Sequence, residues 1–139
     1  SKIIVINNFS DNISYINDFV NLNLVWNTGI GFGFLSTNWN LIYNLISTTI
    51  GLVIFFVIYL KKKKKNIDKI LFSLILGGAI GNFYDRLVYF AVPDFIDIHY
   101  NNFHWFTFNI ADIFISIGII MIVLKDFLFK KPWHKNLKY

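Results

Sequence analysis

Three long apolar stretches occupy most of the second part of the chain. The first covers residues 41–60 without a charged residue, the second starts at Ile70 and is stopped by Pro93, and the third covers about residues 110–128. A helix of about 20 apolar residues crosses the roughly 30 Å hydrocarbon core of a bilayer. The pattern predicts a mainly α, polytopic membrane protein, a helical bundle with transmembrane spans at about 41–60, 70–90 and 110–128.

Two shorter segments have the period-two pattern of β-strands. The segment FVNLNLVW (19–26) alternates apolar and polar residues, and the segment 94–108 fits two short strands around the turn pair Asn101-Asn102. A hairpin over the second segment returns its end to the neighbourhood of Asp94, because a strand advances about 3.3 Å per residue in each direction. We therefore expect a small β-cradle beside the helices.

Clusters of lysine set the expected orientation. One lysine run lies in the 61–69 connection, and further basic residues follow the third span. Cytoplasmic loops carry an excess of Lys and Arg, so both regions are expected on the cytoplasmic side. Segments 1–40 and 91–109 then lie on the extracytoplasmic side of one membrane-embedded domain, residues 1–139.

Composition supports the membrane assignment and excludes several classes of site. The chain is 55% hydrophobic and 15% charged, which is too apolar for an ordinary soluble domain. Its net charge of +5 comes largely from the clustered lysines, so we expect membrane lipid rather than nucleic acid as a partner. With no cysteine, disulfides, thiol nucleophiles and thiolate metal sites are excluded.

Ionisable residues within or beside apolar spans call for a role, because each costs about 2.5–3.5 kcal/mol at membrane depth. The predicted hairpin brings Asp94 near Asp112, at the start of the third span. Two neighbouring carboxylates in a low-dielectric site do not both ionise easily, so one retains a proton. Such a pair supplies a general base and a general acid for peptide hydrolysis without a metal. Asn82 with Asp85, and Asn109 with Asp112, are spaced i,i+3 and share a helix face.

Simpler interpretations remain open for these residues. Asp112 fits an N-terminal helix charge, and Asp94 after Pro93 fits a turn or cap. For Asp85 we prefer an ion pair with Arg86 over membership of the dyad. Arg86 itself fits either snorkelling to head groups or binding of a lipid phosphate or substrate carbonyl.

Four other residues have mainly structural interpretations. Gly77 and Gly81 form a G-x-x-x-G step, which favours close helix packing over catalysis. His99 and His104 fit outer-strand residues without a third ligand nearby, so we expect no metal and no cofactor.

Four ordered motifs resemble those of a known family. The strings NTGIGFGF (27–34), GGAIGNFYDR (77–86), VPDFID (92–97) and WFTFNIAD (105–112) are similar to the motif blocks of lipoprotein signal peptidase, or signal peptidase II. The resemblance implies four spans, a β-cradle, a periplasmic helix, and an aspartic protease. This enzyme cleaves lipid-modified prolipoproteins before a diacylglyceryl-modified cysteine, at the outer face of the bacterial inner membrane.

The resemblance also assigns residue roles. It implies Asp94 and Asp112 as the catalytic dyad. The implied substrate-binding residues are Asn27, Gly29, Asn82, Arg86 and Asn109, and the supporting ones are Lys2, Asp85 and Gly81. Ser1-Lys2 would be the last two residues of a motif that ends the first family span, so we expect a chain whose first span is truncated. We also expect a monomer.

Two other functions compete with this hypothesis. A small proton-coupled transporter also uses intramembrane carboxylates, but it needs polar residues through the bilayer depth, and here they concentrate at one side. A lipid head-group transferase would offer several metal-binding aspartates, for which the pair Asp94 and Asp97 is weak support. A purely structural subunit leaves the carboxylates unexplained.

Overall fold

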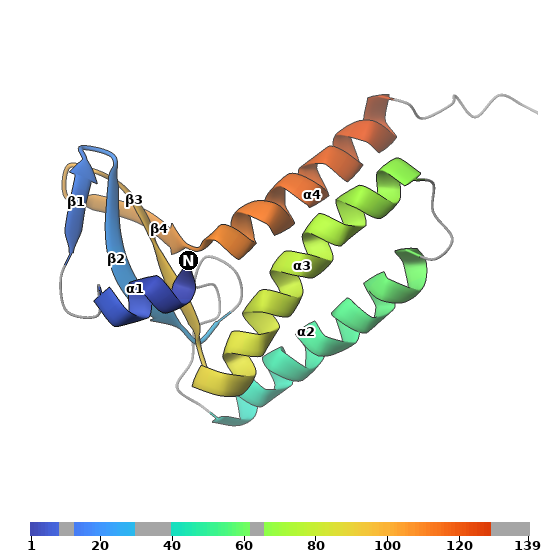
Figure 1. The fold of residues 1–139 in the computed structure, drawn as a ribbon, viewed down its shortest axis with the longest axis horizontal. Coiled ribbons are helices and arrows are strands. Elements are labelled where there is room, and N and C mark those ends of the chain that lie inside the picture. Colours follow the sequence, from blue (N-terminus) through green and yellow to red (C-terminus); the bar gives the residue numbers. More distant parts are fainter. Residues whose placement is uncertain (9–12, 30–39, 62–65, 129–139) are drawn as a thin grey trace, which may run out of the picture.

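The computed structural model describes residues 1–8, 13–29, 40–61 and 66–128. These residues form four helices and one four-stranded antiparallel sheet. In chain order the elements are α1 (Lys2–Asn8), β1 (Ser14–Asn17), β2 (Val20–Asn27), α2 (Asn40–Lys61), α3 (Asn66–Tyr89), β3 (Val92–Tyr100), β4 (Phe103–Phe108) and α4 (Ile110–Leu128). The sheet and α1 lie on one side of the molecule, and α2, α3 and α4 extend away from them (Figure 1).

The three long helices confirm the elements predicted from the apolar stretches. Helix α3 lies between α2 and α4 and contacts both (Figure 1). By length and composition, one helix in the described part of the chain, Ile67–Tyr89, is sufficient to cross a bilayer, and Leu45–Phe56 is a shorter apolar portion of α2. Helix α4 carries three charged residues in its 19 positions. The prediction of three spans therefore stays a prediction.

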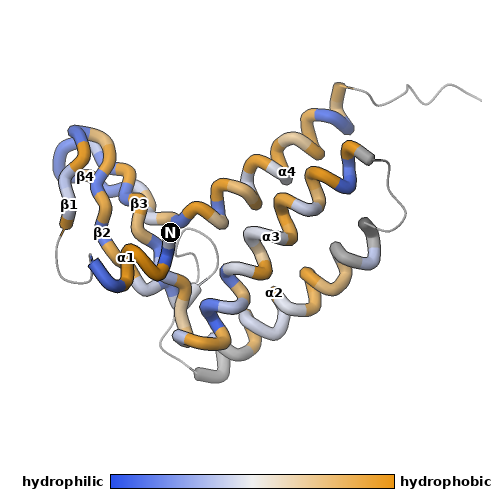
Figure 2. Tube along the Cα trace, viewed as in Figure 1, coloured by the Kyte–Doolittle hydropathy of each residue, from blue (hydrophilic) through white to orange (hydrophobic). Residues whose placement is uncertain are grey.

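Hydrophobic residues recur along α2, α3 and α4 (Figure 2), and many of their large side chains are exposed. Phe55 on α2 is 75% exposed, Leu87 on α3 is 61% exposed and Val123 on α4 is 60% exposed. Soluble monomers rarely expose such extended apolar surfaces, because water solvates them poorly. These helix surfaces fit contact with lipid.

Close contact between α3 and α4 depends on glycines other than the expected pair. A Cβ at Gly78 would lie 2.5 Å from the backbone oxygen of Ala111, and a Cβ at Gly118 would lie 2.5 Å from Cγ1 of Ile75. At Gly77 and Gly81 a Cβ would meet no atom of the described residues within 4 Å. The prediction that Gly77 and Gly81 mediate close packing is wrong, because α3 turns a different face toward α4.

The sheet has the order β1-β2-β3-β4, so β3 is an inner strand. Pairing of Val25 with Asp94 and of Ile96 with Phe108 fixes β3 between its two neighbours. The β3–β4 hairpin turns at Asn101, which has a φ of 52°, a left-handed conformation that asparagine tolerates better than most residues. The predicted strand around 19–26 and the predicted hairpin are both confirmed.

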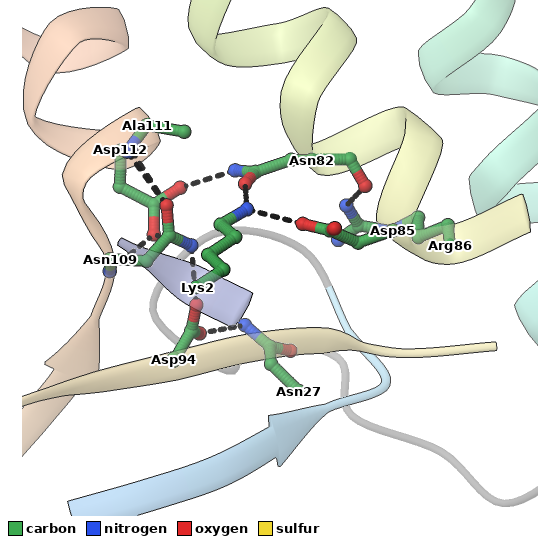
Figure 3. A network of polar contacts seen from close by, with 9 residues as sticks. All are labelled: Lys2, Asn27, Asn82, Asp85, Arg86, Asp94, Asn109, Ala111 and Asp112. Carbon is green, nitrogen blue, oxygen red and sulfur yellow. Dashed lines mark hydrogen bonds and ion pairs between the residues drawn. The ribbon is translucent and has the colours of Figure 1, made fainter. Parts of the chain in front are cut away.

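The sequence patterns predicted an extracytoplasmic β and loop segment over residues 1–40, and helix α1 differs from that prediction. It begins at Lys2, contacts β3 and buries Val5 to 5% exposure. Packing of α1 on the sheet carries Lys2 to the polar residues at the end of α3 (Figure 3).

Candidate functional site

Asn109 and Asp112 cap the start of α4 reciprocally. The side-chain oxygen of Asn109 accepts the backbone N–H groups of Ala111 at 2.8 Å and Asp112 at 3.3 Å. In return, Oδ2 of Asp112 accepts the backbone N–H of Asn109 at 3.1 Å. This arrangement resembles a capping box, which satisfies helix N–H groups that have no partner within the helix. Asp112 is thus the N-terminal helix charge of the simpler interpretation, held in one position by its own helix end.

Asp94 is held from two directions on the inner strand β3. It is 1% exposed, and its carboxylate accepts the side-chain amide of Asn27 at 2.7 Å and that of Asn109 at 2.6 Å. Asp94 therefore lies within a strand, and the interpretation that places it at a turn or cap is wrong. Register explains the contact with Asn27, because Val92 is the direct partner of Asn27 and Asp94 follows two residues later on the same face.

One amide group joins the two carboxylates. Nδ2 of Asn109 lies 2.6 Å from Oδ1 of Asp94 and 2.9 Å from Oδ2 of Asp112 (Figure 3). The two carboxylate oxygens are therefore no farther apart than the sum of these distances. The structure brings Asp94 and Asp112 into one buried polar cluster, with Asp94 on β3 and Asp112 on α4.

Residues of α3 and α1 continue this cluster. Nδ2 of Asn82 donates to Oδ1 of Asp112 at 2.7 Å, and Oδ1 of Asn82 accepts from Nζ of Lys2 at 2.5 Å. Lys2 also forms an ion pair with Asp85. The expected ion pair of Asp85 with Arg86 is wrong, since adjacent residues of a helix point in different directions.

Arg86 connects α3 to the segment that follows β2. It is 5% exposed and donates to the backbone oxygens of Asn82 at 3.3 Å and Gly29 at 2.5 Å. Gly29 in turn donates its N–H to Oδ1 of Asn27 at 2.8 Å. Arg86 is therefore buried rather than snorkelling to the surface, and it helps to place Asn27 against Asp94.

Burial raises the pKa of Asp94 to about 6. The amides of Asn109 and Asn27 favour the charged form and limit the increase, whereas the nearby Asp112 increases the pKa further. Asp94 therefore keeps its proton to a higher pH than an exposed aspartate does.

Two cavities border the polar cluster. The larger, of about 650 Å³, lies between α1, α3 and α4 and is lined by Lys2, Gly81, Asp85 and Ala111 among others. The smaller, of about 220 Å³, is lined by Asp112 and by apolar residues such as Phe106. Both are predominantly apolar spaces that reach a carboxylate.

The structure brings together nine of the ten residues expected at the site. Gly81, the tenth, lines the larger cavity and makes no close packing contact with the described residues. Sequence reasoning missed Tyr43, whose buried hydroxyl donates to the backbone oxygen of Arg86 at 3.1 Å. Tyr43 is one of several polar side chains in α2, so the sequence offered no signal that distinguished it. The nine are Lys2, Asn27, Gly29, Asn82, Asp85, Arg86, Asp94, Asn109 and Asp112.

The histidine pair differs from expectation. His99 lies on the inner strand β3 and His104 on β4, and Nδ1 of His104 is 2.7 Å from the carboxylate of Asp97. The expectation that these histidines lack a third candidate ligand is wrong, because strand pairing places Asp97 beside them.

Known proteins share both the sequence and the fold. The family model described as Signal peptidase (SPase) II matches residues 1–128. The chain is 53% identical over 124 residues to a lipoprotein signal peptidase of Pelagibacter ubique (strain HTCC1062), covering 88% of this chain and 75% of the relative. It is 40% identical over 120 residues to a lipoprotein signal peptidase of Francisella tularensis subsp. novicida (strain U112), covering 84% of this chain and 74% of that protein.

A solved structure described as a bacterial membrane enzyme superposes with a TM-score of 0.71 at 30% identity, over 97% of this chain and 85% of that one. A second, described in the same words, has a TM-score of 0.70 at 29% identity. These similarities place the protein among bacterial membrane enzymes and do not support a transporter. The chain belongs to the signal peptidase II family of membrane peptidases.

Proposed function

We propose that Asp94 and Asp112 form the catalytic dyad of an aspartic endopeptidase that cleaves prolipoproteins before a diacylglyceryl-modified cysteine. The observation that carries this proposal is the amide of Asn109, which donates to both carboxylates at 2.6 Å and 2.9 Å. Burial of both acids, to 1% and 7% exposure, makes double ionisation costly. A pair that shares one proton is suited to acid–base catalysis.

Burial favours Asp94 as the member that holds the proton. Asp112 accepts three hydrogen bonds from N–H groups of Asn82 and Asn109. Asp94 accepts two, and burial raises its pKa to about 6.

The reaction follows from this assignment. Asp112 takes a proton from a water whose oxygen attacks the scissile carbonyl carbon, while Asp94 gives its proton to the carbonyl oxygen. The tetrahedral intermediate collapses as Asp112 passes its proton to the leaving nitrogen, and Asp94 recovers a proton from the hydroxyl group. Each such proton transfer contributes about 10²–10⁴ in rate.

Substrate binding is assigned to Asn27, Gly29, Asn82, Arg86 and Asn109. Nε of Arg86 is buried and has no hydrogen-bond partner among the described residues, which leaves it available to a substrate carbonyl. The cavity of about 650 Å³ adjoins the cluster and offers an apolar space for the lipid-modified segment. The substrate then reaches the dyad laterally from the membrane.

We infer a multi-pass arrangement with the dyad toward the extracytoplasmic face. Lys125 of α4 forms an ion pair with Asp68 of α3 at the helix ends remote from the dyad. The lysine run 61–65 and the basic residues after α4 belong to these same ends in the sequence. The positive-inside rule assigns that end to the cytoplasm. We also propose that the enzyme acts as a monomer in contact with lipid.

A cleavage assay tests the dyad. Purified protein and a lipidated prolipoprotein are incubated and the product is followed by gel shift, with Asp94→Asn and Asp112→Asn compared separately. Each substitution is expected to reduce the rate by a factor on the order of 10²–10⁴ or more. Asp126→Asn, an exposed acid on the same helix as Asp112, serves as the matched control and should retain full activity. Wild-type cleavage by either dyad variant would exclude the assignment.

A further inference from the structure

A second cluster of ligand-type side chains lies on the opposite face of β3 from the dyad. Asp97, His99 and His104 each offer one ligand atom, and these atoms lie within 4.8 Å of one another. Asp94 and Asp97 are three positions apart on one strand, so their side chains leave opposite faces of the sheet. The cluster is therefore separate from the peptidase site.

An irregularity in β4 creates this cluster. His99 pairs with His104 whereas Ile98 pairs with Phe106, so Trp105 is an extra residue in β4. In a regular strand, residues two positions apart lie on the same face, so His104 would lie on the same face as Phe106. Phe106 lies on the face of its partner Ile98, which is opposite to the face of His99. The bulge turns His104 to the face of Asp97 and His99, a re-aiming of side chains that β-bulges often perform at functional sites.

His99, the more buried of the two described histidines, has a nitrogen without a hydrogen-bond partner. His99 is 8% exposed, and its Nδ1 has no hydrogen-bond partner in the described ranges of the chain. A buried polar atom without a hydrogen-bond partner lowers the stability of the fold, so such an atom indicates that a ligand binds there in the functional protein. Asp97 is 2% exposed, and a buried carboxylate also requires compensation by a positive charge.

We propose that Asp97, His99 and His104 bind a divalent transition-metal ion, with Zn²⁺ as the best match. Two imidazoles and one carboxylate are a donor set that zinc accepts, whereas Mg²⁺ and Ca²⁺ prefer oxygen ligands throughout. Zinc–ligand distances of about 2.0–2.2 Å place neighbouring donor atoms roughly 3.2–3.6 Å apart, so small rotations of side chains already within 4.8 Å complete the site.

The exposure of His104 fits binding from solution. The side chain of His104 is 54% exposed, which gives the ion a route of entry and leaves a coordination position open to water. The ion would replace the proton between Nδ1 of His104 and the carboxylate of Asp97, which are now 2.7 Å apart. Bound there, it links β3 to β4 near the hairpin turn, on the side of the molecule away from α2, α3 and α4 (Figure 1).

Metal titration of the untagged protein in detergent tests the proposal. Zn²⁺ binding is measured by competition with a chromophoric chelator, and Co²⁺ is used as a spectroscopic probe of coordination. The wild type should bind a single ion, and His104→Ala and Asp97→Asn should each weaken binding by more than about tenfold. His134→Ala removes the third histidine of the sequence and is the matched control.

The titrations distinguish zinc at this cluster from zinc bound at the dyad or at the C-terminal histidine. Retained binding in His134→Ala and in Asp112→Asn, with weak binding in His104→Ala, supports the site and shows that it is independent of the dyad. Absent binding by the wild type, unchanged binding by His104→Ala, or loss in His134→Ala would overturn it. X-ray absorption of zinc in the wild type should show imidazole ligands even if a variant fails to fold, and a spectrum without imidazole also overturns the proposal.

Discussion

The side-chain amide nitrogen of Asn109 lies 2.6 Å from Oδ1 of Asp94. The N-cap residue of α4 is therefore also a direct hydrogen-bond partner of a carboxylate on β3. The other end of the same side chain accepts backbone N–H groups of α4. One residue thus fixes the helix start and the geometry between the two acids. Changes at this position should affect folding and cleavage by different amounts.

Substitution of Asn109 separates these two roles. Asn109→Ser keeps an oxygen that can cap α4 but removes the amide donor, whereas Asn109→Ala removes both. Both variants should cleave prolipoprotein much more slowly than the wild type. Asn109→Ala should also be less stable than Asn109→Ser by about 1 kcal/mol, the usual value of a cap. Thermal unfolding in detergent measures this difference, and equal stability of the two variants would contradict the capping role.

The raised pKa of Asp94 predicts the pH dependence of activity. If its protonated form is the general acid, kcat/KM should decrease as the pH rises through about 6. Initial cleavage rates at low substrate concentration, measured over a pH series, check this limb of the profile. A rate that stays constant well above this pH would assign the proton to another group.

The same shift predicts a pH dependence of stability. The folded-state pKa of Asp94 is raised from 3.8 to about 6, so the folded protein binds this proton more tightly than the unfolded chain does. The stabilisation is fully present below 3.8 and is lost as the pH rises to about 6. Asp94→Asn should lose this contribution, so the difference in unfolding temperature between it and the wild type should change across that window.

The ion pair of Lys2 with Asp85 should contribute strongly to stability. The two side chains are only 16% and 8% exposed, so Lys2→Met leaves a largely buried carboxylate without its cation. Removal of one partner of a buried pair typically costs about 3–5 kcal/mol. The double variant Lys2→Met/Asp85→Asn should recover part of that loss in thermal unfolding, and a double variant less stable than Lys2→Met would contradict the pairing.

Adjacent glycines of α3 provide a matched test of helix packing. Gly78→Ala places a methyl group 2.5 Å from the backbone oxygen of Ala111, which cannot move freely, and should cost about 1–3 kcal/mol. Gly77→Ala meets no described atom within 4 Å and should be nearly neutral. Unfolding in detergent compares the two, and an equal loss in both variants would contradict the close approach of α3 and α4 at Gly78.

Much of the fold follows from local sequence patterns. Apolar runs predicted the long helices because a helix of that composition buries its backbone hydrogen bonds internally. The turn pair Asn101-Asn102 predicted the β3–β4 hairpin, since asparagine accepts the left-handed conformation that Asn101 adopts. The i,i+3 spacing of Asn109 and Asp112 predicted a shared helix face, and the two residues meet at the start of α4.

The sequence by itself thus determined which residues are polar in an apolar chain, and where the long helices and the hairpin lie, because these depend on neighbours within a few positions. Only the tertiary structure decided the partners. Asp85 pairs with Lys2, which lies 83 positions earlier in the chain on α1. Gly78 rather than Gly77 contacts α4, and the bulge in β4 turns His104 toward Asp97. Such choices depend on the rotation of each helix and the register of each strand, which are fixed by packing between distant segments.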